Sequence, residues 1–340
     1  AAKIAAPPYD VINSEEAREY VEGKPLSFLH VGKPEVDLPQ DIDHYDPKVY
    51  EKGRENLQKL IDEGHLQEDP DDYFYVYAQT MEGRTQYGLV GCSSVDDYWN
   101  DVIKKHEKTR KVKEEDRCNH VRVTNSHSGP IFLTYRDVDE INSLVDTVTQ
   151  MPPEIDFIAE DDIRHQCWTI KDKDTIDIIA KRLNEVDNFY VADGHHRSAA
   201  AGIVGRERQE ANPDHKGNEE YNYFLSVLFP ASHLNIYDYN RVVKDLNGLS
   251  KDEFIEKLKE NFTIEKAGGQ IKPRKKGEMG MYIDGDWYKL NANEKLVKNP
   301  DPVDSLDVAI LQNNVLTPVL AIDDPRTSER IDFVGGIRGL

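Results

Sequence analysis

Short apolar runs alternate with segments of helical periodicity along the chain. The apolar or alternating runs predict strands at residues 26–31, 73–79, 87–92, 131–135, 167–170, 189–192, 221–229 and 279–290. Apolar positions three and four residues apart predict helices at residues 50–63, 95–106, 138–150, 175–186, 197–211, 251–261 and 305–316.

The order of these elements indicates the fold class. The strands at 73–79 and 87–92 follow each other across Met81-Glu82-Gly83-Arg84 with no helix between them, which favours antiparallel pairing. We therefore expect an α+β fold with mixed, largely antiparallel sheets and flanking helices. Charged loops that contain Pro and Gly lie at residues 212–218 and 268–277. The second loop predicts a main domain at 1–267 and a C-terminal subdomain at 268–340.

Composition narrows the class of partner. The 340 residues include 43 Lys and Arg against 64 Asp and Glu, a formal net charge of -21. Such a charge repels long nucleic acid and anionic membrane surfaces. No stretch approaches the roughly 20 apolar residues of a membrane helix, and the N-terminus lacks a basic-then-apolar signal pattern. We expect a cytoplasmic protein whose three distant cysteines are reduced and structural.

The densest group of functional side chains lies between a predicted strand and an alanine-rich helix, at Asp193-Gly194-His195-His196-Arg197. A strand that turns directly into a helix aims backbone N–H groups and the positive end of the helix dipole at one point. Arg197 could hold a phosphate bidentately there, and the imidazoles could contact or protonate it. Gly194 can adopt backbone angles that other residues avoid. The alternative is structural, with Asp193 capping the helix and both histidines at the surface.

Four strings carry a resemblance to a known family. They are Ala192-Asp193-Gly194-His195-His196-Arg197, Pro8-Tyr9-Asp10-Val11, Ser27-Phe28-Leu29-His30 and Lys105-His106-Glu107-Lys108-Thr109. On these strings the chain resembles, over nearly its whole length, the domain-of-unknown-function ten-fifteen family of bacteria and archaea. This resemblance implies no particular reaction.

The Asp193-Gly194-His195-His196-Arg197 turn by itself is similar to the phosphate-binding turn of the ParB/sulfiredoxin-like superfamily, which includes ParB nucleotide-binding domains, sulfiredoxin and free-serine kinases. The resemblance implies that Gly194, His195, His196 and Arg197 hold nucleotide phosphate. It also implies that Asp193 helps to place Mg²⁺ or substrate.

A second constellation is the basic stretch at residues 104–110, which continues through Asp116 and Arg117 to His120. In an acidic protein, this local excess of positive charge is accounted for by a nucleotide or a phosphorylated metabolite, bound by Lys105, His106 and Arg117. Glu107 is a candidate general base toward a hydroxyl group. The alternative is a solvated helix end with alternating charges.

Weaker candidates lie elsewhere. The prolines at 7 and 8 deliver Tyr9 and Asp10 into a loop, where Asp10 could bind a metal or a substrate amine. Asp10 could equally cap a helix at 14–22, which Asn13 or Ser14 followed by acidic residues predicts. Residues 125–130 could line a pocket before the strand at 131. Three further substrate-binding candidates are His30, Asn240 and Arg241.

The spacing of the possible metal ligands along the sequence argues against a dedicated zinc site. Adjacent histidines at a helix start point about 100° apart, so His195 and His196 seldom ligate one ion together. Mg²⁺ carried by a nucleotide needs few protein carboxylates, and Asp193 could supply one.

These observations, taken with the resemblance, predict a kinase of a small hydroxylated metabolite that uses ATP or ADP with Mg²⁺, with serine as the first acceptor to test. Glu107, Asp193 and His196 are the candidate catalytic residues. One alternative is a ParB-like nucleotide-binding regulator without fast turnover. Another is a phosphatase or nuclease that uses the same turn.

Overall fold

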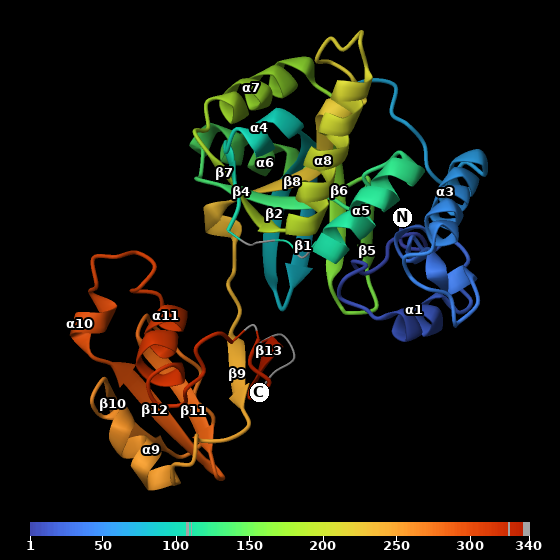
Figure 1. Ribbon diagram of the computed structural model, residues 1–340. Coiled ribbons are helices and arrows are strands. Elements are labelled where there is room, and N and C mark those ends of the chain that lie inside the picture. Colours follow the sequence, from blue (N-terminus) through green and yellow to red (C-terminus); the bar gives the residue numbers. More distant parts are fainter. Residues whose placement is uncertain (107–108, 110, 326, 336–340) are drawn as a thin grey trace. The chain divides into compact units, whose positions relative to one another are not determined.

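The computed structural model describes residues 1–106, 109, 111–325 and 327–335. The chain divides into two compact units, Ala1–Leu234 and Asn235–Leu340. We describe each unit by itself (Figure 1).

The first unit is built on a sheet whose strand order, in the described residues, is β3-β7-β4-β8-β2-β1-β6-β5. The strands are β1 (Phe74–Met81), β2 (Arg84–Ser94), β3 (Ile103–Lys104), β4 (Ile131–Tyr135), β5 (Ile155–Ile158), β6 (Arg164–Ile170), β7 (Phe189–Asp193) and β8 (Tyr223–Pro230). The β3–β7 and β4–β8 pairs are parallel and the other pairs are antiparallel. In the β1–β2 hairpin Met81 pairs with Arg84, and the positive φ angles of Glu82 and Gly83 match the tight turn that joins twisted strands.

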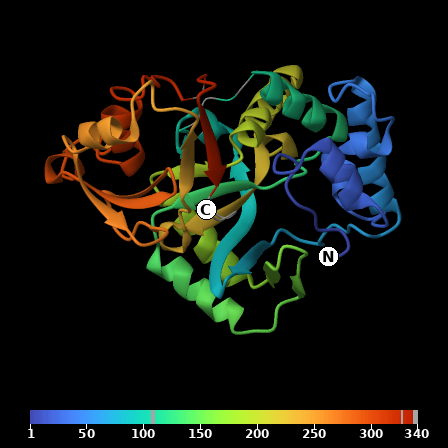
Figure 2. The same ribbon diagram turned by 90° about the horizontal axis from the view of Figure 1, so that it is seen from below.

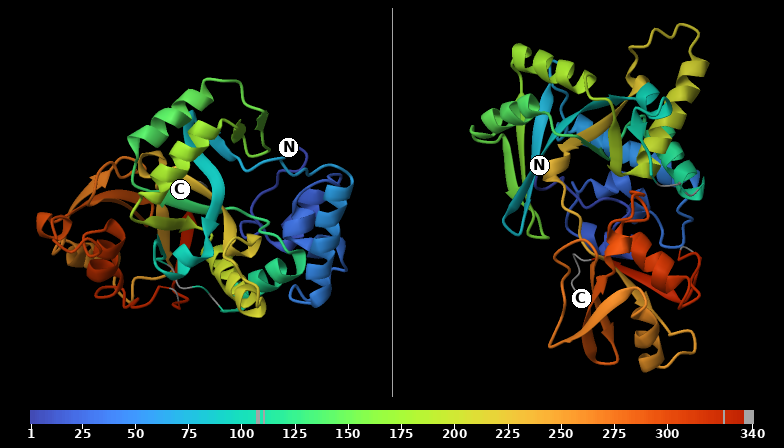
Figure 3. Two further views of the ribbon diagram at one scale, coloured as in Figure 1. Left: turned by 90° about the horizontal axis from the view of Figure 1, so that it is seen from above. Right: turned by 90° about the vertical axis from the view of Figure 1, so that its left-hand side faces the viewer.

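The helices of this unit gather around the sheet. They are α1 (Ser14–Val21), α2 (Leu29–Gly32), α3 (Pro47–Asp62), α4 (Val95–Trp99), α5 (Lys111–Thr124), α6 (Asp139–Thr149), α7 (Lys173–Asn184) and α8 (His195–Ala211), with short 3₁₀ turns η1 (Pro34–Asp37), η2 (Glu220–Asn222) and η3 (Ala231–His233). Figures 1 and 3 show α6 and α7 together on one side of the sheet.

The two faces of the sheet have different environments, because side chains alternate along a strand. Val76 and Leu133 are fully buried on the face that packs against α6 and α7, where Ile141 and Ile179 complete the main core. The opposite face is met by the N-terminal segment, residues 1–32. Figures 2 and 3 show the N-terminus near β5 on that side.

The second unit has its own sheets and core. Its elements are β9 (Tyr239–Val243), α9 (Lys251–Leu258), β10 (Phe262–Ala267), β11 (Glu278–Ile283), β12 (Asp286–Ala292), α10 (Glu294–Val297), α11 (Asp307–Leu311), the π-helix η4 (Gln312–Leu316) and β13 (Ile331–Gly335). In its described residues, β12 pairs with both β10 and β11, and β9 pairs with β13. Phe254, Leu258 and Ile310 are buried in its core.

The expected class, α+β with largely antiparallel sheets and flanking helices, is confirmed. The strand predicted at 26–31 is wrong, because α2 occupies its second half, and a short apolar run does not separate a strand from a buried helix. The helix predicted at 95–106 stops at Trp99, and β3 follows. The loop at 268–277, where the sequence places a domain boundary, lies inside the second compact unit, since β10 before it and β11 after it share β12.

Candidate functional site

A large cavity lies in the first unit, on the sheet face opposite the main core. Its volume is about 1440 Å³. Ordinary small-molecule sites measure about 300–1,000 Å³, so this cavity is larger than an ordinary single-ligand site. Its walls are the N-terminal segment, α5, the loop at 127–130, the strand face from β7 to β5, and the start of α8.

The turn between β7 and α8 forms one end of this cavity. Gly194 is the N-cap of α8 and has φ 91° and ψ 33°, the left-handed region that glycine adopts without strain, as expected from the sequence. A Cβ atom on Gly194 would lie 3.1 Å from Cζ of Arg197. The positive φ therefore requires glycine here, and an added Cβ would displace the guanidinium that lies over it by a few tenths of an ångström.

Arg197 links the turn to the neighbouring loop. Its Nη2 donates to Oδ2 of Asp193 at 2.6 Å, and its Nη1 donates to the carbonyl of Pro130. The Arg197 side chain is 15% exposed and that of Asp193 is 65% exposed. An arginine carries five N–H donors, so its capacity exceeds these two bonds. Asp193 is engaged with Arg197 and does not cap α8, which has no side-chain cap.

The structure brings His106, from the second constellation, to the start of α8. Strand β3 pairs in parallel with β7, with Lys104 opposite Tyr190, so the residues after β3 run beside the end of β7. The ring of His106 meets that of His195 edge-on, with 4.4 Å between centroids. His195 is buried and His196 is half-buried.

Lys105, in the same stretch, points to a different neighbour. Its ammonium donates to the carbonyl of Tyr98 at 2.6 Å and pairs with Asp101 at 2.7 Å. Glu107 lies outside the described residues.

Arg117 provides a second guanidinium at the cavity. Its Cζ lies 4.0 Å from the centre of the Tyr9 ring, and its Nη2 pairs with Asp116 at 2.6 Å. Burial raises the pKa of Tyr9 to about 12, although the charges of Arg117 and Arg197 both act to lower it. Tyr9 therefore keeps its proton and feels both guanidinium groups. Asp10 is exposed and is not among the residues of the cavity wall.

His120, on α5, ends the second constellation of the sequence, and it is a buried residue of the cavity wall. Its Nε2 lies 2.9 Å from the carbonyl of Val31, and burial lowers the pKa of His120 to about 4, with the Arg117 charge acting in the same direction. Residues 127–130 line the cavity, which confirms the pocket expected for that half of the 125–130 loop.

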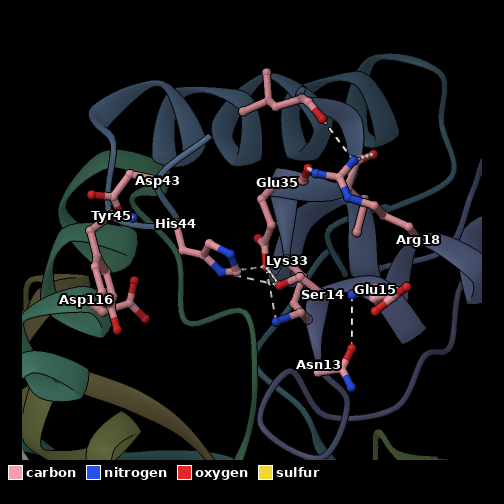
Figure 4. Close-up of polar contacts among 12 residues, drawn as sticks. Asn13, Ser14, Glu15, Arg18, Lys33, Glu35, Asp43, His44, Tyr45 and Asp116 are labelled. Atoms are coloured by element: carbon pink, nitrogen blue, oxygen red, sulfur yellow. Dashed lines mark hydrogen bonds and ion pairs between the residues drawn. The ribbon is translucent and has the colours of Figure 1, made fainter. Parts of the chain in front are cut away.

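The N-terminal segment is held by a well-bonded start of α1 (Figure 4). Asn13 caps α1 and forms a capping box with Glu16, so the helix predicted after Asn13 is confirmed and Asp10 is not its cap. Buried Glu35 accepts from Ser14 at 2.7 Å and pairs with Lys33 at 3.1 Å. Burial raises the pKa of Glu35, but Lys33 and the hydrogen bonds outweigh it and hold the pKa below its usual value.

Of the three weaker candidates, His30 is not among the residues of the cavity wall. His30 bonds through Nδ1 to Asp37 at 2.9 Å, which raises the pKa of His30. Asn240 and Arg241 belong to β9 of the second unit. There Arg241 lies 5.4 Å from the ring centre of Phe333.

In the described part of the chain, no group of three or more His, Cys, Asp and Glu side chains is arranged to hold a metal ion. Nor does any of the described helices combine the length and apolar character needed to cross a bilayer.

Fold and site together define a mixed α+β protein with a ligand-sized cavity that ends on a strand–glycine–helix junction beside two arginines. The chain belongs to the family described as Protein of unknown function (DUF1015), whose model matches residues 1–309. No match was found among curated proteins or among solved structures.

Proposed function

We propose that this protein is a phosphotransferase that moves phosphate from a nucleotide to a small hydroxylated metabolite. The observation that carries the proposal is the Arg197–Asp193 pair, which lies over Gly194 at the start of α8 and at one end of the cavity. A helix N-terminus and a guanidinium at the same point form a recognised arrangement for phosphate. Arg117 adds positive charge on a second wall of the same cavity.

The size of the cavity supports a transfer between two ligands. The cavity of about 1440 Å³ exceeds an ordinary single-ligand site of about 300–1,000 Å³. The resemblance of the turn to those of free-serine kinases makes serine the first acceptor to test. ATP or ADP would be the donor, with its phosphates at Arg197 and the first turn of α8.

The reaction requires positioning and charge neutralisation. The acceptor hydroxyl oxygen attacks the terminal phosphorus, the bond from that phosphorus to the bridging oxygen breaks, and the electron pair leaves with the nucleotide. The hydroxyl proton passes to a carboxylate. Asp193 is the described candidate, since its carboxylate is exposed at the cavity end. Glu107 is the second candidate base. The resemblance of the turn makes His195 and His196 candidates for phosphate contacts, although neither is among the residues of the cavity wall.

Mg²⁺ bound to the donor would neutralise phosphate charge, and it needs few protein ligands. Asp193 is the described carboxylate of the turn that would contact it.

The test is product formation. The protein is incubated with ATP or ADP, Mg²⁺ and a pool of hydroxylated metabolites that includes serine, and new phosphorylated products are sought by mass spectrometry. A phosphorylated metabolite supports the proposal. Donor hydrolysis alone would indicate a phosphatase, and nucleotide binding with no product would indicate a regulator.

Two variants on α8 distinguish an effect at the phosphate site from an effect on the helix as a whole. Arg197→Ala should reduce nucleotide affinity and product formation at least tenfold, because it removes a charge-assisted phosphate contact. Arg206→Ala is the matched control, since its guanidinium lies 4.3 Å from the ring centre of Trp99 and not at the cavity. Equal effects of both variants would contradict the proposal.

A further inference from the structure

Two hydrogen-bond donors at the cavity, one on Tyr9 and one on Arg117, have no acceptor among the described residues. Asp116 accepts from Nε of Arg117 at 2.8 Å and pairs with Nη2 at 2.6 Å, which leaves Nη1, within the described part of the chain, with two N–H groups and no acceptor. The hydroxyl of Tyr9 likewise makes no hydrogen bond to a described residue. Both residues line the cavity and neither donor atom is fully buried, so both donors are open to a ligand.

The two donors lie close enough together for one carboxylate group. Cζ of Arg117 lies 4.0 Å from the centre of the Tyr9 ring, and that same ring carries the hydroxyl. Burial raises the pKa of Tyr9 to about 12, so the hydroxyl keeps its proton and can donate it. An ionised carboxylate is an acceptor only, and its two oxygens match a guanidinium N–H and a neighbouring O–H.

The surroundings of Arg117 suit a carboxylate better than a phosphate. The Asp116 side chain is only 15% exposed, so it stays paired with Arg117 and offsets much of its charge. Arg117 also lies beyond the first turn of α5, and the effect of a helix dipole falls off within that turn. At the β7–α8 turn, in contrast, Asp193 is 65% exposed and Arg197 lies in the first turn of the helix. A singly charged group is therefore matched to Arg117, and a phosphate is matched to Arg197.

Arg117 and Arg197 lie at the same end of two packed helices. A buried cluster joins α5 to α8, and its members are Cys118, Val121, Ala200 and Val204. Each arginine comes shortly before the cluster residues of its own helix, and Arg122 pairs with Glu207 beyond the cluster. Both arginine charges also act to lower the pKa of Tyr9, so both guanidinium groups lie within electrostatic range of its hydroxyl. An acceptor held at Arg117 is therefore near the phosphate site.

We propose that Arg117 and Tyr9 bind the carboxylate of the phosphate acceptor, so that the acceptor is a hydroxylated carboxylic acid. This proposal rests on the proposed function, because it takes the donor phosphate at Arg197 from it. Nη1 of Arg117 and the hydroxyl of Tyr9 donate to the carboxylate, and the hydroxyl group of the acceptor extends toward Arg197. Serine and glycerate belong to this class. Serinamide and glycerol have the hydroxyl group without the carboxylate.

Calorimetric titration of the full chain with these two matched pairs tests the carboxylate site without any turnover. Glycerate should bind at least tenfold more tightly than glycerol, or serine than serinamide, because a hydrogen bond to a charged group is made only by the acid. Tyr9→Phe keeps the ring and removes one donor, and it should weaken binding of the acid about tenfold. Tyr73→Phe is the matched control, since it removes a hydroxyl that bonds Asp71 outside the cavity wall. Equal affinities within both pairs, or an unchanged affinity of Tyr9→Phe for the acid, would overturn the proposal.

Inorganic tripolyphosphate separates the carboxylate site from the phosphate site. Arg117→Gln should weaken binding of the acid at least tenfold and leave tripolyphosphate binding within about twofold of wild type, whereas Arg197→Ala should weaken tripolyphosphate binding. If Arg117→Gln weakens tripolyphosphate binding as much as Arg197→Ala does, Arg117 belongs to the phosphate site and the carboxylate assignment is wrong. If Arg197→Ala leaves tripolyphosphate binding unchanged while binding of the acid still depends on Arg117, the phosphate site at the turn is wrong and the carboxylate site stands.

Discussion

Arg117 of α5 holds its guanidinium 4.0 Å from the ring centre of Tyr9, so the N-terminal segment and a helix about a hundred residues later meet at the wall of one cavity. The carboxylate of Asp116 accepts a hydrogen bond from Arg117 and another from the hydroxyl of Tyr50 on α3, the second at 3.0 Å. The cation that faces the cavity is therefore held in place by a carboxylate and a ring.

The contact between Arg117 and Tyr9 should contribute to stability through the ring and not through the hydroxyl. Tyr9→Leu should lower the free energy of unfolding by about 1 kcal/mol, as for a partly desolvated cation–π contact. Tyr9→Phe keeps the ring and should lose less. Urea unfolding of both variants measures the difference, and equal losses would show that the ring contact contributes nothing.

Gly194→Ala should damage the turn in two ways. Its positive φ costs a non-glycine residue about 1–2 kcal/mol, and the new Cβ would lie 3.1 Å from the Arg197 guanidinium. Gly64 is a matched control, because it has φ 74° and nothing within 4 Å of an added Cβ. Both alanine variants should lose similar stability, but only Gly194→Ala should weaken ADP binding. Weaker ADP binding in Gly64→Ala as well would mean that global destabilisation, and not the position of Arg197, is responsible.

Stability should fall in acid because of His120. The pKa of His120 is about 4 in the folded protein against 6.5 for an ordinary histidine. Between these values the unfolded chain binds a proton that the folded protein does not, so the free energy of unfolding decreases as the pH falls. The full effect of such a shift is about 3 kcal/mol, reached near the lower pKa.

The variant His120→Gln isolates this contribution, since a glutamine amide can donate to the carbonyl of Val31 and does not titrate. Unfolding free energies of wild type and variant, compared between about pH 7 and about pH 5, should show a smaller pH dependence in the variant. His65→Gln, at an exposed histidine, should keep the wild-type dependence. An unchanged slope in His120→Gln would contradict this assignment.

The strand–turn–helix junction was predictable because its signals are local. The apolar strand, the glycine and the alanine run of α8 lie next to each other in the sequence, so each supports the assignment of its neighbours. The hairpin at Met81 was predictable for the same reason.

The far wall of the cavity was not predictable, because it depends on strand order. His165 and Tyr77 are 88 positions apart, and they meet only because β6 pairs with β1. The strand expected at 73–79 contains Tyr77, but a strand assignment does not say which other strand lies beside it. Helix α5 was missed because its charged residues hide its short apolar face, so the burial of His120 went unseen.

The central claim is that the β7–α8 turn binds phosphate. A crystal structure of the protein with ADP and Mg²⁺ tests it most directly. We expect the terminal phosphate within hydrogen-bond distance of the Arg197 guanidinium and of the first backbone N–H groups of α8. A nucleotide whose phosphates lie elsewhere, with Arg197 bonded only to Asp193 and Pro130, would contradict it.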